Sequence, residues 1–455
     1  MQHSYDSLDR PGGFGGLNLL APLRHRDFRI LWAGMTVSLL GDGIFLVALA
    51  WHVYSIENAP SALSLVGIAM TIPTIVFLLP GGVISDRLDR RTIMLLSDLL
   101  RAVAIGAMAA LTLAGSGTLW EIAGLSMVYG VGTAFFTPAF EAVIPDLLPS
   151  ADLPAANSLD QFVRPIALRL AGPAVGGALI GLLGSGAAFG VDAASFLVSA
   201  VTVLAIAPTP HRGGGDARLI DDIRSGMRFI RGRVWIWGTL VSAAVAYLLF
   251  LGPTEVLLPY LVKNDLHDSA RTLGLVFAAG GVGAVGSAIV MGQRDQPRRH
   301  ITFIYATWTL ATLAVAGYGL ATAAWQVMVA CLAFNALETA GTIVWATLKQ
   351  RHVPGNMLGR VSSLDWLISI GFLPLSFALT APVAAAVGTR TTLVGAGVAG
   401  AVVTVAALFL PGMRDVEREP ELPQEPASPP ADPAAEAVNV LVETLQPRST
   451  TDTRS

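Results

Sequence analysis

Long apolar segments recur along most of the chain and are separated by short polar breaks. A hydrocarbon layer about 30 Å thick needs about 20 apolar residues in a helix to cross it. Roughly twelve segments reach this length, at 30–54, 63–84, 92–114, 119–140, 159–183, 187–207, 234–262, 273–291, 300–320, 324–348, 364–387 and 391–410. The pattern therefore predicts an all-α membrane protein with twelve transmembrane helices.

Two polar stretches divide this pattern into parts. The first mixes arginines with apolar residues, which indicates an amphipathic helix on the cytoplasmic membrane surface. The second is rich in Pro, Glu, Ala and Ser and buries too little apolar surface to fold. We expect a cytoplasmic N-terminal segment at 1–28, a six-helix bundle at 29–207, a linker with the amphipathic helix at 208–233, a second six-helix bundle at 234–411 and a disordered cytoplasmic tail at 412–455.

Composition agrees with a membrane protein and excludes other classes. The chain is 53% apolar and 13% charged, whereas an average soluble domain is about 25% charged. Its net charge of −3 gives no reason to expect a nucleic acid or another strongly charged partner. The single cysteine, Cys331, excludes an intramolecular disulfide framework and a thiolate metal cluster. The N-terminus lacks the short apolar core of a secretory signal, so we expect no removal there.

Basic residues predict the orientation in the membrane. The breaks on the N-terminal side hold most of them, namely Arg24, Arg26, Arg29, Arg87, Arg90, Arg91, the arginines from Arg212 to Arg233, Arg294, Arg298, Arg299, Lys349, Arg351, Arg360, Arg414 and Arg418. The opposite side has Lys263, Arg271 and Arg390. Because cytoplasmic loops carry the excess of Lys and Arg, we expect a multi-pass protein of the cell inner membrane with both termini in the cytoplasm.

The two sets of six helices show signs of duplication. A Pro-bearing break precedes a Ser-Leu-Asp sequence after the fourth helix, at 145–160, and again after the tenth, at 353–365. Two six-helix units in the same orientation are a known plan of transport proteins with parallel repeats. The alternative explanation is that the two short polar segments resemble each other by chance.

A charged motif lies between the second and third predicted helices. It reads Gly-Val-Ile-Ser-Asp-Arg-Leu-Asp-Arg-Arg at 82–91. This sequence is similar to the loop signature of the major facilitator superfamily, Gly-x-x-x-Asp-Arg-x-Gly-Arg-Arg, with Asp89 in place of the usual glycine. An ordinary positive-inside loop would explain the arginines but not the glycine and the aspartate.

The resemblance implies a gate on the cytoplasmic side. Its residues would be Gly82, Asp86, Arg87, Arg90 and Arg91. In the family the acidic residue docks on a helix of the other half and the basic residues clasp it, which holds the outward-open form closed toward the cytoplasm. Here Asp86 would meet the helix start at 359–362, where unpaired backbone amides carry partial positive charge.

The fifth predicted helix contains a glycine and proline motif. Gly172, Pro173, Gly176 and Gly177 resemble the Gly-Pro-x-x-Gly-Gly core of the antiporter signature in this superfamily, although the upstream glycine is replaced near Leu168. Proline and glycine bend a helix and let a neighbour approach closely, so the motif implies a pivot between moving parts. Packing of small residues without any directional meaning is the alternative.

The resemblance extends over nearly the whole membrane portion, from Arg24 to about Arg414. Further matching segments lie at 138, 145–146, 156–159 and 359–361, and the pattern is similar to the drug-exporter branch that includes macrolide and siderophore efflux proteins. It implies the major facilitator fold and proton-coupled efflux of a small hydrophobic or amphiphilic compound, such as a drug, an antibiotic or a siderophore-like metabolite, by alternating access. Protons, a small-molecule substrate and the lipid bilayer are the expected partners of a monomer.

Three acidic residues stand well inside apolar segments. Asp42, Glu255 and Glu338 lie in the first, seventh and tenth predicted helices. An ionisable group at a helix centre costs about 2.5 to 3.5 kcal/mol on insertion scales, so such groups usually serve a pathway or a partner. We interpret them as candidates for proton binding. A carboxyl group bonded to a neighbouring hydroxyl, or one close to the outer interface, is the alternative, above all for Glu255.

Other charges have a partner at helical spacing. Asp98 and Arg101 are three residues apart, and Asp160 and Arg164 are four apart, so each pair shares a helix face. We expect both to be structural ion pairs. Arg169 has no such partner, so it either faces the cavity or pairs with a carboxylate of another helix. The sequence does not distinguish a structural from a functional role for Asp192.

Several other functions find no support in the sequence. Two segments, 281–286 and 395–400, fit Gly-x-Gly-x-x-Gly, but they lie within apolar runs and follow no strand. We interpret them as close helix contacts rather than as nucleotide sites. The chain has no Gly-Lys-Ser/Thr phosphate loop, no zinc spacing and no nucleophile elbow, so we expect no nucleotide, no cofactor, no metal and no enzymatic activity.

The sequence leaves three functions open. Proton-driven export leads, with six aromatic side chains as candidates for the cavity wall, namely Phe45, Trp51, Phe135, Phe136, Trp345 and Trp366, unless they face lipid. An importer or a lipid flippase on the same fold differs in its direction of transport. A membrane sensor that moves nothing would depend on the linker helix or on the tail.

Overall fold

The computed structural model describes residues 20–149, 152–207, 219–294 and 296–417. The beginning of the expected N-terminal segment, the Gly-rich part of the linker and most of the expected tail lie outside this part. So do the side chains of a few helix residues, among them Asp86 and Arg87 of the expected gate.

Twelve helical spans in the described residues are long and apolar enough to cross a membrane, and no strand occurs among these residues. The predicted all-α fold with twelve transmembrane helices is therefore confirmed. The N-terminal bundle comprises α1 (Arg26–Ile56), α2 (Pro60–Arg87), α3 (Arg90–Leu113), α4 (Leu119–Leu147), a composite fifth span of α5 (Leu153–Pro165), η3 (Ile166–Ala171) and α6 (Gly172–Leu183), and α7 (Ser185–Ala205).

The C-terminal bundle repeats this plan after the linker helix α8 (Leu219–Arg231). Its elements are α9 (Val234–Tyr260) with η4 (Leu261–Asp265), α10 (Ala270–Gly292), α11 (His300–Leu320), α12 (Ala324–His352), a composite eleventh span of α13 (Gly355–Gly371) and α14 (Leu373–Val387), and α15 (Thr389–Leu408). Short 3-10 turns, η1 (Ala21–Arg24) and η5 (Asp415–Glu417), flank the two bundles.

Two spans predicted as single helices are interrupted. In the fifth, a π-helical turn, η3, separates α5 from α6 and lies between Pro165 and Pro173. In the eleventh, α13 ends at Gly371 and Pro374 stands in the first turn of α14. Proline has no backbone N–H and its ring clashes with the preceding turn, so a helix breaks or bends at such places.

The ordered structure extends beyond residue 411, after which we expected a disordered tail. Met413 and Val416 are buried against the C-terminal bundle. The side chain of Glu417 accepts a hydrogen bond of 3.0 Å from the backbone N–H of Thr302 in the first turn of α11. Because apolar burial and a helix-end hydrogen bond hold this segment, order extends through Glu417 rather than ending at 411.

The linker helix α8 packs against the C-terminal bundle. A Cβ atom on Gly226 would lie 2.9 Å from the Leu364 side chain of α13, and Ile230 is buried among residues of that bundle. The apolar residues at this end of α8 therefore contact protein, in addition to any contact with a membrane surface.

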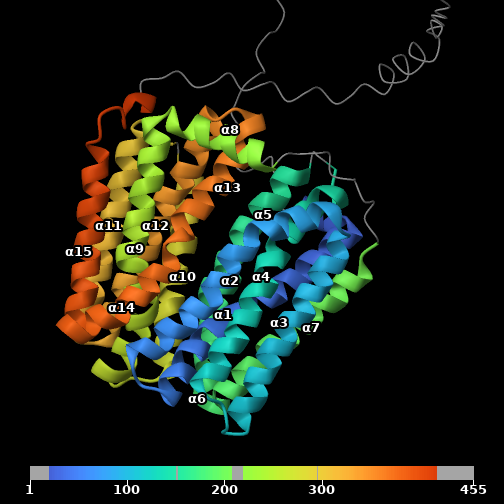
Figure 1. The fold of residues 1–455 in the computed structure, drawn as a ribbon, viewed down its shortest axis with the longest axis vertical. Helices are drawn as coiled ribbons and strands as arrows, with labels where there is room; N and C mark the ends of the chain where they lie inside the picture. The colour runs from blue at the N-terminus through green and yellow to red at the C-terminus, as the bar shows by residue number, and fades with distance from the viewer. Residues whose placement is uncertain (1–19, 150–151, 208–218, 295, 418–455) are drawn as a thin grey trace, which may run out of the picture.

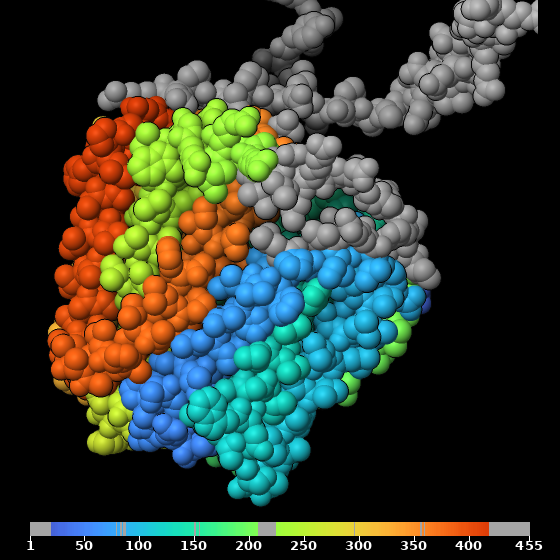
Figure 2. Space-filling view, in the orientation of Figure 1, coloured from blue at the N-terminus to red at the C-terminus, as the bar shows by residue number. Residues whose placement is uncertain are grey.

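The two bundles form a V (Figure 1). They separate at the end that carries α8 and converge at the opposite end. At the converging end, the hydroxyl of Tyr54 on α1 donates a 2.6 Å hydrogen bond to the carbonyl of Val256 on α9. Asn58 and Asn264 join the two bundles through their side-chain amides. The helices α2 and α14 also pack directly against each other where the two bundles meet (Figure 2).

Glycines bring the backbones of α6 and α10 into contact. A Cβ atom on Gly274 would lie only 2.4 Å from the carbonyl oxygen of Pro173 and 2.9 Å from the Cα of Gly177. Farther along, a Cβ atom on Gly281 would lie 2.4 Å from the carbonyl oxygen of Arg169. No larger residue fits at these positions without a shift of backbone, so glycine determines how closely the two bundles approach.

We predict that Gly274→Ala lowers the stability of the detergent-purified protein, because the new methyl group must displace the Pro173 backbone. Overpacking of this kind typically costs about 1 to 3 kcal/mol. Gly286→Ala on the same helix is the matched control, since nothing lies within 4 Å of its Cβ position. Thermal unfolding measures the difference, and equal midpoints for the two variants would contradict the close contact.

Candidate functional site

A cavity with two lobes lies between the bundles. One lobe, the N lobe, has a volume of about 400 Å³ and is lined mostly by the N-terminal bundle. The other, the C lobe, has a volume of about 440 Å³ and is lined mostly by the C-terminal bundle. The two lobes share four apolar lining residues, Leu46, Met70, Leu168 and Ile370. Each volume is within the range of small-molecule pockets, about 300 to 1,000 Å³.

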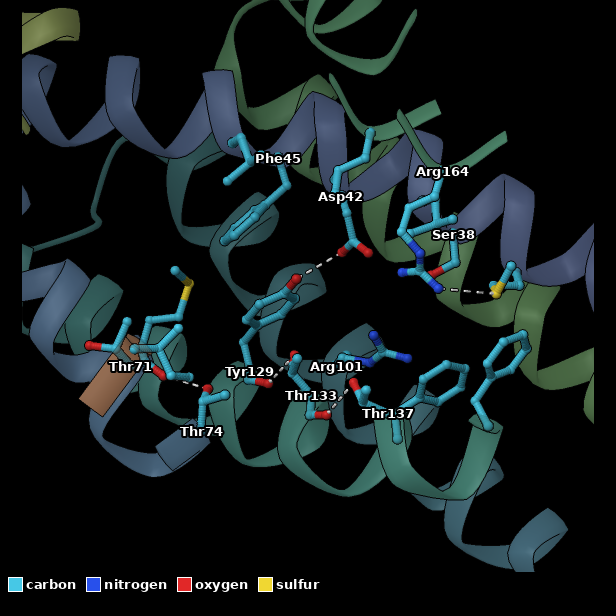
Figure 3. A pocket seen from close by; sticks show the side chains of 18 of the residues that line it. Ser38, Asp42, Phe45, Thr71, Thr74, Arg101, Tyr129, Thr133, Thr137 and Arg164 are labelled. Atoms are coloured by element: carbon cyan, nitrogen blue, oxygen red, sulfur yellow. Dashed lines mark hydrogen bonds between the residues drawn. The ribbon is translucent and has the colours of Figure 1, made fainter. Parts of the chain in front are cut away.

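Asp42 lies on the wall of the N lobe, in the middle of α1 (Figure 3). The hydroxyl of Tyr129 on α4 donates a 2.8 Å hydrogen bond to Asp42 Oδ1. The rings of Tyr129 and Phe45 lie 4.9 Å apart and close one side of the site. The carboxyl group therefore faces the cavity while one of its oxygens is held by a phenol.

A buried ion pair lies behind this wall. Arg101 Nη2 donates to Asp98 Oδ1 at 2.5 Å, and both residues belong to α3. The guanidinium carbon lies 4.3 Å from the ring centroids of both Phe136 and Phe196, a distance at which aromatic faces stabilise a cation. Arg101 also lines the N lobe, so this pair joins the cavity to the bundle interior.

A third carboxyl group, Asp192 on α7, is completely buried next to the same site. A Cβ atom on Gly41 would lie 2.4 Å from Asp192 Oδ1, so the missing side chain of Gly41 leaves the space for it. Its charge interacts with that of Asp42. Asp42, Asp98 and Asp192 thus lie near the guanidinium of Arg101, and Arg164 brings a second guanidinium to the cavity side of the site.

Asp160 and Arg164 form the second predicted ion pair, with two N–O distances of 3.1 Å. The structure therefore contains both pairs that the helical spacing predicts. Arg164 and Arg101 both line the N lobe, where their guanidinium groups point into the same space as Asp42 (Figure 3). Their role as purely structural pairs stays a prediction.

Glu255 and Glu338 line the C lobe, from α9 and α12. The structure therefore does not bring them together with Asp42, which lies in the other lobe. The hydroxyl of Thr342 donates a 3.0 Å hydrogen bond to Glu338 Oε1. Glu255 lines the cavity, one residue before Val256 at the converging end of the bundles. Arg169, which had no partner at helical spacing, also lines the C lobe.

The expected gate is described only in part. The side chains of Asp86 and Arg87, and the surroundings of Gly82, lie outside the described residues. Arg90 forms a 2.6 Å ion pair with Asp146 at the end of α4. Arg91 donates a 2.9 Å hydrogen bond to the carbonyl of Val203 on α7. Both arginines thus tie the start of α3 to helices of their own bundle.

Asp89, which departs from the family pattern, caps a helix. Its carboxylate accepts hydrogen bonds from the backbone N–H groups of Arg91 at 3.3 Å and Thr92 at 3.1 Å, in the first turn of α3. An aspartate in this position satisfies donors that have no partner within the helix. The substitution for glycine therefore gives α3 a defined beginning.

The antiporter-like motif lies where three helices meet. Its first and second glycines face α1, because Cβ atoms on Gly172 and Gly176 would lie 2.7 Å from the Cα of Gly43 and 2.9 Å from the Cα of Ile44. Gly177 faces α10 in the other bundle. The motif therefore packs helix against helix both within the N-terminal bundle and between the bundles.

Sequence reasoning missed Tyr129 and the partner of the buried Lys349. Lys349 is buried at the end of α12, and its ammonium group contacts Asp365 of α13. The indole of Trp345 donates a 2.9 Å hydrogen bond to the same carboxylate. The Ser-Leu-Asp repeat was an available signal, because its two aspartates, Asp160 and Asp365, both hold a cation. For Tyr129 the sequence offers no comparable signal.

The aromatic candidates divide between cavity and core. Phe45, Phe136 and Trp366 line the N lobe. Trp345 instead packs edge to face against Trp235, with 5.7 Å between the ring centroids. The hydropathy of an aromatic residue does not say which of these places it takes.

We predict that Arg101→Ala destabilises the protein far more than Arg164→Ala. Arg101 is 3% exposed, so its loss strands a buried carboxylate, at a typical cost of about 3 to 5 kcal/mol. The Arg164 side chain is 43% exposed, and pairs of this kind contribute about 1 kcal/mol or less. Chemical unfolding compares the two variants. The double variant Asp98→Asn, Arg101→Met should regain much of the loss, and similar losses in both single variants would contradict the prediction.

Comparisons with known proteins agree with this geometry. A family model described as a transmembrane secretion effector matches residues 17–444. The multidrug efflux pump Tap of Mycolicibacterium fortuitum is 29% identical over 408 residues, which cover 85% of this chain and 96% of that protein. Macrolide efflux protein A of Streptococcus pyogenes is 23% identical over 397 residues, which cover 86% of this chain and 96% of that protein.

Solved transporter structures share the fold. A bacterial homolog of the human lysosomal transporter Spinster, in an inward-facing and unoccupied conformation, has a TM-score of 0.59 at 16% identity and covers 88% of this chain and 98% of its own. A POT family transporter has a TM-score of 0.65 at 13% identity, over 83% of this chain and 95% of its own. Since the family model spans nearly the whole sequence, the chain belongs to the transmembrane secretion effector family of major facilitator transporters and is not an enzyme.

Proposed function

We propose that this chain is a secondary active transporter that exports small hydrophobic or amphiphilic compounds in exchange for protons, by alternating access. The observation that carries the proposal is the two-lobed cavity between the bundles, with a carboxyl group, Asp42, in its wall. The curated relatives named for multidrug and macrolide efflux support export and this class of cargo.

The α8 end of the molecule faces the cytoplasm in this proposal. Helix starts and ends alternate along the chain, so the α8 end also carries the arginines that begin α1, α3 and α11. The other end has Lys263, Arg271 and Arg390. The excess of positive charge favours the cytoplasm for the α8 end. Because the bundles separate there, the described conformation takes up its cargo from the cytoplasmic side.

Export then requires the bundles to rock. The contacts at the converging end, such as Tyr54 to Val256 and Asn58 to Asn264, must break for the cavity to open outward. The glycine contact of α6 with α10 involves backbone rather than long side chains. Such a contact tolerates rotation, so this seam is suited to act as the pivot.

Asp42 carries the proton in this mechanism. Its carboxyl group lines the cavity and is therefore reachable from it. A proton taken up while the cavity opens outward would neutralise Asp42 and be released after the return to the cytoplasmic side. Tyr129, which donates to Asp42 Oδ1, orients the carboxyl group for this exchange.

We predict that Asp42→Asn abolishes uphill export driven by an imposed pH gradient in proteoliposomes, because an amide cannot take up the transported proton. Exchange of labelled for unlabelled cargo, which needs no net proton movement, should persist within about threefold. Glu57→Gln, at an exposed position just after the same helix, is the matched control. Full gradient-driven export by the Asp42 variant would remove this residue from the coupling role.

We also expect a definite direction of transport. Inside-out vesicles that contain the protein should accumulate ethidium when respiration acidifies their interior, and they should release it when an uncoupler is added. Right-side-out vesicles should show the opposite movement. Accumulation by right-side-out vesicles alone would favour an importer on the same scaffold.

A further inference from the structure

One cationic side chain of the N-terminal bundle reaches into the C lobe. Arg169 belongs to the π-helical turn η3, and its Nη1 donates a 3.2 Å hydrogen bond to Oδ1 of Asn335 on α12. Its side chain is exposed to the cavity rather than buried in a helix contact. The bond therefore runs between the two bundles, across the space that a transported molecule would occupy.

The C lobe has more negative than positive groups. Among its described lining residues the charged ones are Arg169, Glu255 and Glu338, so full ionisation leaves one uncompensated negative charge. The charge of Arg169 interacts with that of Glu255. Uncompensated charge inside a membrane protein is costly, so the lobe is stabilised by one additional positive charge, which either a proton or a bound organic cation supplies.

The remaining wall suits an organic cation. Six aromatic side chains line the C lobe, namely Tyr247, Phe250, Phe277, Tyr318, Phe334 and Phe377. Aromatic faces attract cations and also provide apolar contact area, in particular where water is excluded. A compact inorganic ion would gain little from such a wall, whereas an amphipathic cation would use both the rings and the carboxylates.

The backbone of Arg169 is held in a helix contact, whereas its side chain is free to rotate. The backbone is pressed against α10, because a Cβ atom on Gly281 would lie 2.4 Å from the carbonyl oxygen of Arg169. The long side chain extends from this seam toward Asn335. The guanidinium can therefore leave Asn335 by rotation of side-chain bonds alone, without a shift of the helix contact.

We propose that Arg169 is a specificity-determining residue, an internal cation that competes with an amphipathic organic cation for Glu255 and Glu338. The ligand displaces the guanidinium from Asn335, in the lobe that Glu255 and Glu338 also line, and the guanidinium returns when the ligand leaves. The charge of the ligand that the C lobe prefers then depends on Arg169 as well as on Glu255 and Glu338. The inference rests on the proposed function, since it names the class of cargo that the same cavity selects.

Two ions of nearly equal size and opposite charge test the proposal. Tetraphenylphosphonium is a cation and tetraphenylborate an anion, so their binding ratio reports the charge preference of the site and not its shape. Binding of each labelled ion to the purified full-length chain in lipid nanodiscs is measured by equilibrium dialysis, without a proton gradient. The variants are Arg169→Gln, Arg169→Lys and, as a matched loss of charge outside the cavity, Arg271→Gln.

We predict that Arg169→Gln binds tetraphenylphosphonium about tenfold more tightly than the unchanged protein and binds tetraphenylborate more weakly, because the competing charge is gone. Arg169→Lys keeps the charge and should retain the original ratio within about threefold. Arg271→Gln should leave the ratio unchanged. Thermal unfolding of each variant verifies that a weak signal does not come from loss of fold.

The proposal is overturned if Arg169→Gln leaves the ratio unchanged or weakens cation binding in a folded protein. It is also overturned if the unchanged protein and the variant both fail to bind the cation. Failure of the proposed export function has a different signature. Then the binding ratio still responds to Arg169, while proteoliposomes show no gradient-driven movement of tetraphenylphosphonium.

Discussion

The architecture depends on the close backbone contact between the fifth span and α10. At Gly177, Gly274 and Gly281 the absence of side chains lets two helices from different bundles approach to van der Waals distance of their main chains. Lipid tails are as apolar as the helix surfaces, so close packing rather than hydrophobic burial holds such helices together. This seam sets how closely the two bundles approach, and the bundles separate from each other toward the α8 end (Figure 1).

Charge compensation within each lobe is the second constraint. The charged residues in the wall of the N lobe are Asp42, Glu141, Arg101 and Arg164, with Asp98 and Asp192 buried behind it, and those of the C lobe are Glu255, Glu338 and Arg169. The wall of the C lobe thus has more acid than base, whereas acids and bases in the wall of the N lobe are equal in number, and the two lobes also hold their cations differently. In the N lobe the compensating cation is buried within its own bundle and fixed between two rings, whereas in the C lobe it is exposed and comes from the other bundle.

The hydropathy pattern was sufficient to predict twelve spans, because crossing a membrane imposes a minimum apolar length. The spacing of Asp98 and Arg101 predicted their ion pair for a similar local reason, since residues three apart share a helix face. Both inferences use only distances along one helix.

The rest of the site depends on how helices are rotated about their axes. In a membrane, a helix surface that faces lipid is as apolar as one that faces the core, so the sequence gives no amphipathic signal for rotation. The bond from Tyr129 to Asp42 therefore could not be foreseen, because the two residues are on different helices. The position of Glu255 in the cavity wall also depends on helix rotation and could not be predicted from the sequence. The ordered segment that ends at Glu417 could not be predicted either, because it depends on a contact with α11.

The number of residues in the π-helical turn η3 affects which cargo the cavity selects. A π-helical turn contains an extra residue relative to an α-helical turn, and it changes the direction in which neighbouring side chains project. Arg169 stands within this turn, and the turn directly precedes Gly172 and Pro173 of the packed motif. Deletion of a single residue here would convert the turn to α-helix and reorient the guanidinium relative to the seam. A gap or an insertion among related chains at this point can thus alter the preferred cargo without any change of side chain in the cavity.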